Sequence, residues 1–438
     1  MLLLAYLDTS DVVLVKKTGS FRKLNELIYQ FLFSSAFPEL ARLEKGNFTR
    51  DRSLPLLSLF LIILRNIKQS LQLEIDDFFK LWDVAGVIPV SKQAFSKART
   101  GLNYLVIVHL FTKILRRMCK IKDLDYYNGK YRLCAMDGSD VALYNSVELI
   151  EKYGCSGGST KAVSALASLA FDPLNNIILD GSMNPVGTDE RVCARQHIEN
   201  VIKLPLKRKC KNLFIMDRGY PSKEFLSYLL GKKLKFLIRV RRKFNLEFDD
   251  VTHDEVVSFV WENRKYRVRI LKVMLDSGEY ETLVTNLDGK DMPYENAEEL
   301  YFKRWGIETK FNSLKNKLEL ENMSGRRVVT VQQDFWASLF LANMFASLEW
   351  ETNAIIEDRT TDSGNKHKQT TNENRLINKA RKVFIRLLLE TNPDRKRCMY
   401  SELFEDIAQR PVEIKPGRAS PRTTPRNAKF HDTYKSVT

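Results

Sequence analysis

The 438 residues exceed the size of one ordinary hydrophobic core, and 44% hydrophobic residues are enough to fill two or three domains. Lysine and arginine number 70 against 54 acidic residues, and the formal net charge of +16 favours a polyanionic partner such as a nucleic acid. A basic surface kept for solubility would give the same balance. This composition excludes an intrinsically disordered chain.

Cysteine usage and the length of the apolar runs exclude other classes of protein. The six cysteines form no C-x-x-C pair and the five histidines do not cluster with them, so neither a zinc module nor a disulfide framework is indicated. The opening MLLLAYL lacks the basic region of a signal peptide. Leu54–Leu64, the longest apolar run, has 11 residues, whereas a membrane span needs roughly 20. We therefore expect a buried helix there, no membrane contact, and a reducing, cytoplasmic setting.

Residues 1–125 are predicted to form a helical, DNA-binding N-terminal domain. Helical periodicity, broken by glycine and proline, predicts helices at Phe21–Phe37, Leu54–Gln69, Ile75–Val84 and Tyr104–Met118. Ser91 is a candidate N-cap, and it is followed by Lys92, Lys97 and Arg99 at near-helical spacing. This basic segment is either the recognition helix of a helix-turn-helix or a solvated basic face.

Residues 126–235 and 290–350 are predicted to form an α/β core, a mixed sheet flanked by helices. RLCAMDGSDVALY, AVSALASLAFD and NNIILDGSM predict neighbouring strands. A helix at about Asp189–Ile202, the strand NLFIMD and a helix at Ser222–Leu230 follow. The alternating pattern of residues 236–289 predicts a β-rich insertion into this core.

Residues 351–438 are predicted to form a helical C-terminal segment with a basic tail. VQQDFWASLFLANMFASLEW predicts an apolar helix that leads into this region, residues 359–374 predict a loop, and Arg375–Leu389 predicts one more helix. From Arg410 to Thr438, seven basic residues face two acidic ones, a net charge of +5, and four prolines favour an extended chain. The tail is either a nucleic-acid arm or a solvated tail.

Three carboxylates are candidates for a divalent-metal site. Asp137 in MDGSD and Asp217 in FIMDRGY each end an apolar run, with Gly138 or Gly219 close behind, which would leave space for a metal or a phosphate. Glu308 lies on a helix predicted from about Tyr294 to Leu320. Two Mg²⁺ ions need hard oxygen ligands, and we predict that Asp137 bridges them while Asp217 and Glu308 hold one each, with Mn²⁺ as a substitute. A turn-forming aspartate before glycine is the structural alternative.

The helix that carries Glu308 is predicted to present a polar stripe. At about 100° per residue, an arc of about 60° holds Tyr301, Arg304, Glu308 and Lys315. The adjacent apolar stripe holds Ile307, Phe311, Leu314 and Leu318. We predict that Arg304 and Lys315 contact DNA phosphates and that Tyr301 serves as a hydroxyl donor or stacking surface. An i, i+4 ion pair between Arg304 and Glu308 explains the same spacing.

The spacing from Tyr301 to Lys315, Y-x2-R-x3-E-x6-K, resembles the hallmark of the DDE transposases of the bacterial insertion-sequence-four family. MDGSD, D-R-G-Y, LELENMSG and GRASPR resemble the same family, so the resemblance covers most of residues 20–430. It implies a ribonuclease-H-like fold, binding to terminal inverted repeats of double-stranded DNA, and Mg²⁺-dependent strand cleavage and transfer into a target. It also implies a homodimer on paired DNA ends and a nucleoid-associated location.

The resemblance also implies roles for single residues. The acids would hold the metals, and the Tyr, Arg and Lys of the motif would handle the strand near the cleaved end. Some relatives hold a flipped base with an aromatic residue of the β insertion, which here would be Trp261; a core position is the alternative. Glu190 and His197 share one face of a predicted helix, and they either support the site or form a surface pair.

Two other functions fit parts of the sequence. AMDGSD resembles the D-x-D loop of haloacid-dehalogenase enzymes, which would make the protein a phosphatase with an aspartyl nucleophile. Two residues separate Asp137 from Asp140, however, where that loop has one. A non-catalytic DNA-binding protein or an inactive transposase would occupy DNA ends without cutting them.

Overall fold

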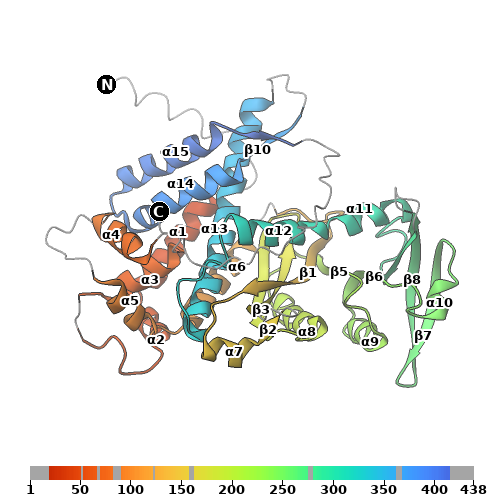
Figure 1. Cartoon of the computed structure of the whole chain (residues 1–438). Coiled ribbons are helices and arrows are strands. Elements are labelled where there is room, and N and C mark those ends of the chain that lie inside the picture. The colour runs from red at the N-terminus through yellow and green to blue at the C-terminus, as the bar shows by residue number, and fades with distance from the viewer. Residues whose placement is uncertain are drawn as a thin grey trace. The chain divides into compact units, whose positions relative to one another are not determined.

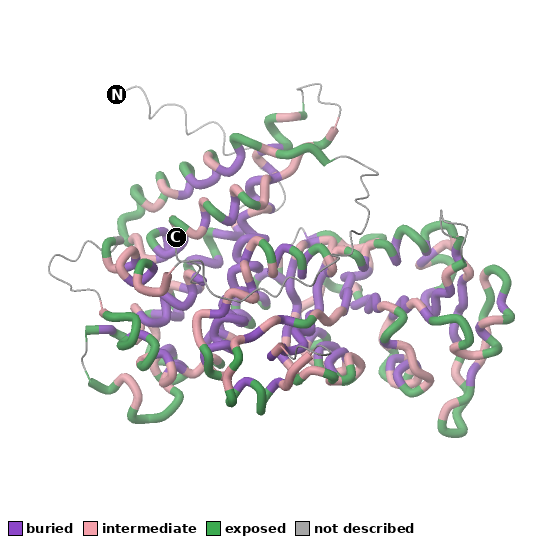
Figure 2. Tube along the Cα trace, viewed as in Figure 1, coloured by how far each residue is buried: buried purple, intermediate pink, exposed green. Residues whose placement is uncertain are grey.

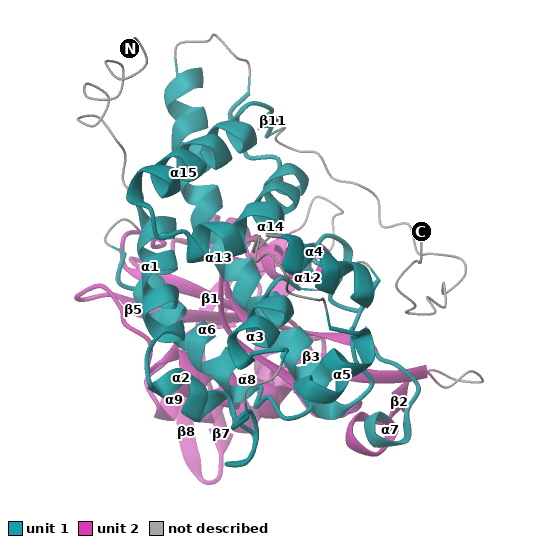
Figure 3. Cartoon of the chain, turned by 90° about the vertical axis from the view of Figure 1, so that its left-hand side faces the viewer, with its two compact units in different colours: residues 1–123, 143–149, 314–438 teal, residues 124–142, 150–313 magenta. Residues whose placement is uncertain are grey.

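The computed structural model describes residues 19–50, 53–66, 70–81, 90–121, 124–156, 162–274, 280–361 and 367–414 (Figure 1). The chain divides into two compact units (Figure 3). Unit 1 comprises residues 1–123, 143–149 and 314–438, so both ends of the chain contribute to it. Unit 2 comprises residues 124–142 and 150–313, and it contains every predicted site residue except Lys315. The opening MLLLAYL and residues 415–438 of the predicted tail lie outside the described residues.

Unit 1 is built from helices. Its helices are α1 (Ser20–Leu32), α2 (Ala36–Ala41), α3 (Leu56–Leu64), α4 (Leu71–Leu81), α5 (Lys92–Arg99), α6 (Leu105–Met118), α13 (Val328–Thr360), α14 (Glu373–Leu389) and α15 (Pro393–Ala408). Nearly all side chains in the first two-thirds of α13 are buried (Figure 2), as in a helix at the centre of a bundle. None of the described helices is long and apolar enough to cross a membrane.

Most of the predicted helices in unit 1 are confirmed, with two corrections. The helix predicted at Phe21–Phe37 is two helices, since α1 ends at Leu32 and α2 begins at Ala36. Beyond α14, the sequence analysis missed α15 and the short strand pair of β10 (Gln369–Thr370) with β11 (Val412–Glu413). α15 has a clear start signal, because the Asn392 side chain accepts hydrogen bonds from the backbone at its N-terminus and Pro393 follows.

The basic segment at α5 differs from both sequence interpretations at one position. Its N-cap is confirmed, because the Ser91 hydroxyl accepts a hydrogen bond from the Ala94 backbone N–H at 3.2 Å. Arg99, however, is buried and forms a 2.8 Å ion pair with Asp334. It also donates to Gln333, Ser324 and the Thr330 carbonyl. A buried guanidinium needs such partners, so Arg99 is structural and does not belong to a DNA-facing or solvated surface.

Replacing Ser91 by alanine is expected to lower the free energy of unfolding by about 1 kcal/mol, because one backbone donor at the start of α5 would lose its acceptor. Ser96→Ala, at an exposed position inside the same helix, is the matched control and is expected to change stability by less than about 0.5 kcal/mol. Urea unfolding followed by circular dichroism measures both. Equal effects of the two substitutions would contradict the capping role.

Unit 2 is built on one mixed sheet. Its strands are β1 (Tyr131–Ala142), β2 (Cys155–Ser156), β3 (Ala162–Asp172), β4 (Ile177–Asn184), β5 (Lys211–Met216), β6 (Lys235–Val240), β7 (Asp254–Trp261), β8 (Arg264–Met274) and β9 (Tyr280–Thr285). This nine-stranded sheet has the order β2-β3-β1-β5-β6-β9-β8-β7, with β4 also paired to β3. β5 is parallel to β1 and to β6, and the other pairs are antiparallel. An antiparallel β4-β3-β1 meander continued by two parallel strands is consistent with a ribonuclease-H-like fold.

Helices flank this sheet on both faces (Figure 1). α8 (Glu190–Val201) and α9 (Lys223–Gly231) lie on one face, and α11 (Ala297–Phe302) lies on the other. The helices α7 (Val147–Tyr153), α10 (Leu246–Asp249), η1 (Tyr294–Asn296) and α12 (Trp305–Asn316) complete the described elements. The predicted mixed α/β core with flanking helices is therefore confirmed.

The β-rich insertion begins later than the predicted boundary at residue 236. That boundary cuts β6, which pairs in parallel with β5 and so belongs to the central sheet. β9 then pairs antiparallel with β6, and β8 and β7 follow outward. The inserted strands thus extend the core sheet, because β6 would otherwise leave an unpaired edge.

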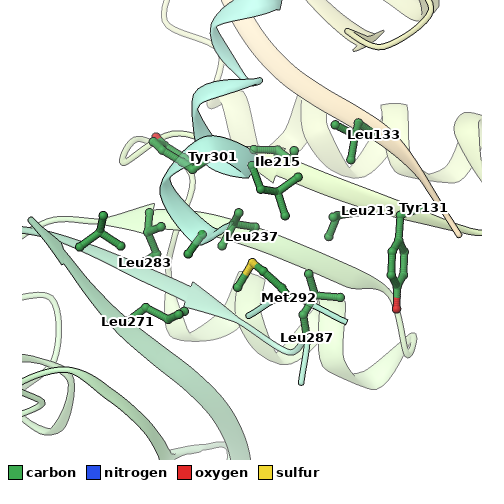
Figure 4. Close-up of a cluster of buried hydrophobic side chains, with 13 residues drawn as sticks. Tyr131, Leu133, Leu213, Ile215, Leu237, Leu271, Leu283, Leu287, Met292 and Tyr301 are labelled. Atoms are coloured by element: carbon green, nitrogen blue, oxygen red, sulfur yellow. The ribbon is translucent and has the colours of Figure 1, made fainter. Parts of the chain in front are cut away.

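A hydrophobic cluster joins the face of the sheet to α11 (Figure 4). Leucine and isoleucine side chains of β1, β5, β6, β8 and β9 meet Leu300 and Tyr301 there. Figure 4 shows the ring of Tyr301 against this cluster and its hydroxyl pointing away from the aliphatic side chains. The packing fixes α11 at the edge of the sheet where the chain leaves β5.

Candidate active site

Asp137, on β1, and Asp217, directly after the neighbouring parallel strand β5, lie close to each other. Ala135 on β1 is paired with Ile215 on β5, so two residues further along the same register Asp217 lies beside Asp137. Both side chains point to the same face, because orientation alternates along a strand. Both residues are half-buried. The sequence analysis placed both aspartates at the ends of strand-like runs: Asp217 does follow the last residue of β5, but Asp137 lies within β1, which continues to Ala142.

The surroundings of Asp137 disfavour its ionised form. Burial raises its pKa to about 7, and the nearby carboxylates of Glu190 and Asp217 act in the same direction. Two contacts oppose this: the Gly138 backbone N–H donates to Oδ1 at 3.0 Å, and the Arg304 guanidinium is close enough to favour the carboxylate. A carboxylate in this setting is stabilised by any added cation.

The carboxylate of Glu190 lies close to those of Asp137 and Asp217. β4 is antiparallel to β3, which is antiparallel to β1, so β4 ends at the same edge of the sheet as β1 and β5. α8 begins just after β4 with Asp189 as its N-cap, which brings Glu190 to that edge. Burial raises the pKa of Glu190, and Asp217 adds to this by repulsion. The surface pair of Glu190 and His197, weighed from the sequence, is therefore not what the structure shows.

The space expected beside Gly138 and Gly219 is occupied by the side chains of Leu166, Asp217 and Glu190. A Cβ atom added to Gly138 would lie 2.9 Å from Leu166 Cδ1 and 3.5 Å from Glu190 Cδ. One added to Gly219 would lie 3.1 Å from Asp217 Oδ1 and 4.0 Å from Glu190 Oε2. The tight contacts are therefore with Leu166 and with Asp217 itself, whereas the Glu190 carboxylate lies within ordinary van der Waals distance of both aspartate turns.

Tyr220 and His197 support this edge from the buried side. The Tyr220 hydroxyl is fully buried, and burial followed by the charges of Glu190 and Asp137 raises its pKa well above 10. Within the described residues it forms no hydrogen bond of normal geometry. His197 is also buried and contacts Asp180 at 2.8 Å and the Ser168 hydroxyl at 3.0 Å. Ser168 in turn reaches the Asp137 carbonyl at 3.5 Å, so His197 braces β3 against β1.

The helix predicted from Tyr294 to Leu320 is interrupted. α11 ends at Phe302 and α12 begins at Trp305. The backbone N–H groups of Arg304, Gly306 and Ile307 donate to carbonyls three residues earlier, a tighter hydrogen-bonding pattern than that of an α-helix. Gly306 also approaches the turn after β3, where an added Cβ would lie 2.8 Å from Pro173 Cβ. The angular arithmetic of one continuous helix therefore does not hold across this break.

The motif residues around the break are only partly arranged as predicted. Ile307, Phe311, Leu314 and Leu318 are buried, as expected of the apolar stripe. Tyr301 is 6% exposed; burial raises its pKa to about 12, although Arg304 acts against this. Arg304 is equally buried and donates to Glu308 Oε1 at 2.8 Å. Arg304, which was predicted to contact a DNA phosphate, therefore forms the alternative i, i+4 ion pair with Glu308 in this structure.

The structure does not bring all predicted site residues together. Among the described residues, no group of three or more His, Cys, Asp or Glu side chains is arranged to hold a metal ion. Glu308 is engaged by Arg304. Lys315, in the last turn of α12, belongs to unit 1 and lies 3.5 Å from Glu321.

Trp261 lies at the opposite edge of the sheet from Asp217. Asp217 follows Met216, which is paired with Ile238 on β6. Following the pairing on through β9, the residue of β8 at the same height as Asp217 is Leu271. Trp261 is paired with Arg264 at the far end of β8, on the outermost strand. It is half-buried and thus not a core residue either.

Residues 128–344 match a protein-family model described as "Transposase DDE domain", and this match supports a DDE-type transposase. The matched range contains all the predicted site residues. Among solved structures, the cryo-EM structure of the piggyBac transposase synaptic complex with hairpin DNA resembles this chain with a TM-score of 0.45 and 10% sequence identity, covering 91% of this chain and 88% of that chain. A likeness at this level by itself establishes no function. No curated protein matches the chain significantly.

Proposed function

We propose that this protein is a DNA transposase of the insertion-sequence-four family, which binds terminal inverted repeats and cleaves and transfers DNA strands. The observation that carries the proposal is the proximity of Asp137 on β1 to Asp217, which directly follows the neighbouring parallel strand β5, inside the range that matches the transposase domain. The net charge of +16 supports a DNA partner. By analogy with that family, two copies would act on paired DNA ends in the nucleoid.

The donor set fits a divalent metal of the Mg²⁺ or Mn²⁺ type. Asp137 and Asp217 offer hard oxygen ligands, and the charge of Asp217 disfavours the ionised form of Asp137 until a cation is present. These two residues would hold the metal, and Glu308 would join them once Arg304 no longer engages it. When bound, the metal supplies charge neutralisation at the scissile phosphate and activation of the attacking water or hydroxyl.

The other motif residues would position the DNA strand. Arg304 is a guanidinium already at the site, and a phosphate can replace the Glu308 carboxylate as its bidentate partner. Lys315 would make a further phosphate contact, and Tyr301 would offer its hydroxyl, which forms no hydrogen bond of normal geometry within the described residues. A role for Trp261 in holding a flipped base would need DNA to reach the far end of the β7–β8 hairpin.

The test uses duplexes taken from the DNA that flanks this chain's own coding sequence, incubated with Mg²⁺ or with EDTA. A transposase produces strand breaks at a defined position only with the metal. A non-catalytic DNA-binding protein would retain the duplex without breaks, an outcome that the pairing of Glu308 with Arg304 keeps open. Hydrolysis of p-nitrophenyl phosphate without DNA cleavage would instead indicate the phosphatase.

Binding to these duplexes is expected to weaken steeply with salt. If several phosphates are neutralised, the affinity should fall by roughly 1,000-fold or more between 50 and 200 mM salt. Fluorescence anisotropy at a series of salt concentrations measures the slope. A slope near zero would mean that the positive charge of the chain does not serve DNA binding.

A further inference from the structure

The sequence left two roles for Glu190, support of the site or a surface pair with His197, and its surroundings do not fit the surface pair. Its carboxylate lies against Gly138 on one side and Gly219 on the other, the two glycines of the aspartate turns. A larger residue at Gly138 would clash with Leu166, and its Cβ would meet Glu190 at an ordinary contact distance of 3.5 Å. The Glu190 carboxylate is thus close to both aspartate turns and acts electrostatically on Asp137, as Asp217 does.

The charged groups nearest Glu190 are acids. Among the described residues, the charged groups with the largest effect on it are Asp217, Asp189 and Asp140, all acids. The arginines of its own helix are turned elsewhere, since Arg191 pairs with Asp189 at 2.7 Å and Arg195 pairs with Glu224 at 2.6 Å. A half-buried acid among acids is costly unless something positive binds there.

The buried hydroxyl of Tyr220 is a second observation at the same cluster of acids. The Tyr220 hydroxyl is fully buried, and Glu190, Asp137 and Asp217 are the charged groups that face it. It forms no hydrogen bond of normal geometry among the described residues, although it lies close to the Glu190 carboxylate. Buried hydroxyls normally have a partner, and the Glu190 carboxylate is the acceptor close to this donor.

We infer that Glu190 is an additional carboxylate of the metal site formed by Asp137 and Asp217, as a direct ligand or outer-sphere partner, and that Tyr220 orients it. This inference rests on the proposed function. It gives the DNA-free protein three carboxylates from β1, β5 and α8, while Glu308 stays paired with Arg304. Glu308 would then complete the site only when DNA phosphates engage Arg304.

The test measures Mn²⁺ binding to the full-length, DNA-free protein by electron paramagnetic resonance of the free ion. Glu190→Gln should weaken Mn²⁺ affinity by roughly tenfold or more, and Tyr220→Phe should weaken it by a smaller factor. Glu308→Gln should change it by less than about threefold. Glu199→Gln is the matched control, because Glu199 lies on the same helix but pairs with Lys232 at 2.7 Å.

The outcomes separate this inference from the proposed function. If Asp217→Asn loses Mn²⁺ while Glu190→Gln and Tyr220→Phe bind it like the unmodified protein, Glu190 has no role at the metal and the proposed function stands. If the unmodified protein cleaves DNA but binds Mn²⁺ only with DNA, a DNA-free site involving Glu190 is ruled out. If it neither binds Mn²⁺ nor cleaves, the proposed function itself fails. Thermal melts confirm that each variant is folded.

Discussion

Replacing Asp217 by asparagine is expected to lower Mg²⁺-dependent strand cleavage by roughly 1,000-fold or more. Asparagine keeps the size of the side chain and an oxygen for the Gly219 N–H, which donates to Asp217 Oδ1 at 2.6 Å. It removes the negative charge that a divalent cation requires of its ligand. The loss should therefore appear in the chemical step, with little change in folding or DNA affinity.

The cleavage assay is run on the flanking-DNA duplexes with excess enzyme, so that a single turnover is observed. Asp250→Asn is the matched control, because Asp250 is exposed and lies in the same unit at the end of α10. It should cleave at the rate of the unmodified protein. Cleavage by the Asp217 variant within about tenfold of that rate would show that Asp217 does not hold the catalytic metal.

The second large effect concerns stability without metal. Burial raises the pKa of Asp137 from 3.8 to about 7, so the folded protein retains a proton that the unfolded chain releases. Below about pH 4 the Asp137 carboxyl is protonated in both the folded and the unfolded state, so the free energy of unfolding does not change. As the pH rises from about 4 to about 7, the free energy of unfolding should fall by at most about 4 kcal/mol.

Asp137→Asn should remove this dependence. The variant is expected to be more stable than the unmodified protein at pH 8 and of similar stability near pH 4. Addition of Mg²⁺ at pH 8 should raise the melting temperature of the unmodified protein and leave that of the variant unchanged. Differential scanning calorimetry at the two pH values measures this. A variant that is less stable at pH 8 would mean that Asp137 is stabilised as a carboxylate by the protein alone.

The strands that carry or precede the two aspartates could be predicted because short stretches of the sequence indicate them. Apolar runs such as that before Asp217 give strands, and an acid at the end of a run marks the edge of the sheet. The sequence analysis named Glu190 as a possible support of the site without placing it, and the same reasoning could have placed it. The Asp189 N-cap was recognisable, and once β4 is known to run parallel to β1, the helix that follows must begin at the edge that carries Asp137.

Other features depend on contacts that no local pattern reveals. The break between α11 and α12 reflects the close approach of Gly306 to Pro173, far away in sequence. Arg99 looked like a surface cation until its partner Asp334 was known. The spacing of Arg304 fitted either a DNA-phosphate contact or an ion pair with Glu308. Its burial and its 2.8 Å contact with Glu308 show that it forms the ion pair in this structure.

The most direct test of the central claim is the position of Mn²⁺ in crystals, located by anomalous scattering. The account predicts a peak between the carboxylates of Asp137 and Asp217 in the DNA-free protein, with Glu190 beside it. A peak elsewhere in the chain, with no density at these two aspartates even at saturating Mn²⁺, would contradict the assignment of this edge of the sheet as the catalytic metal site.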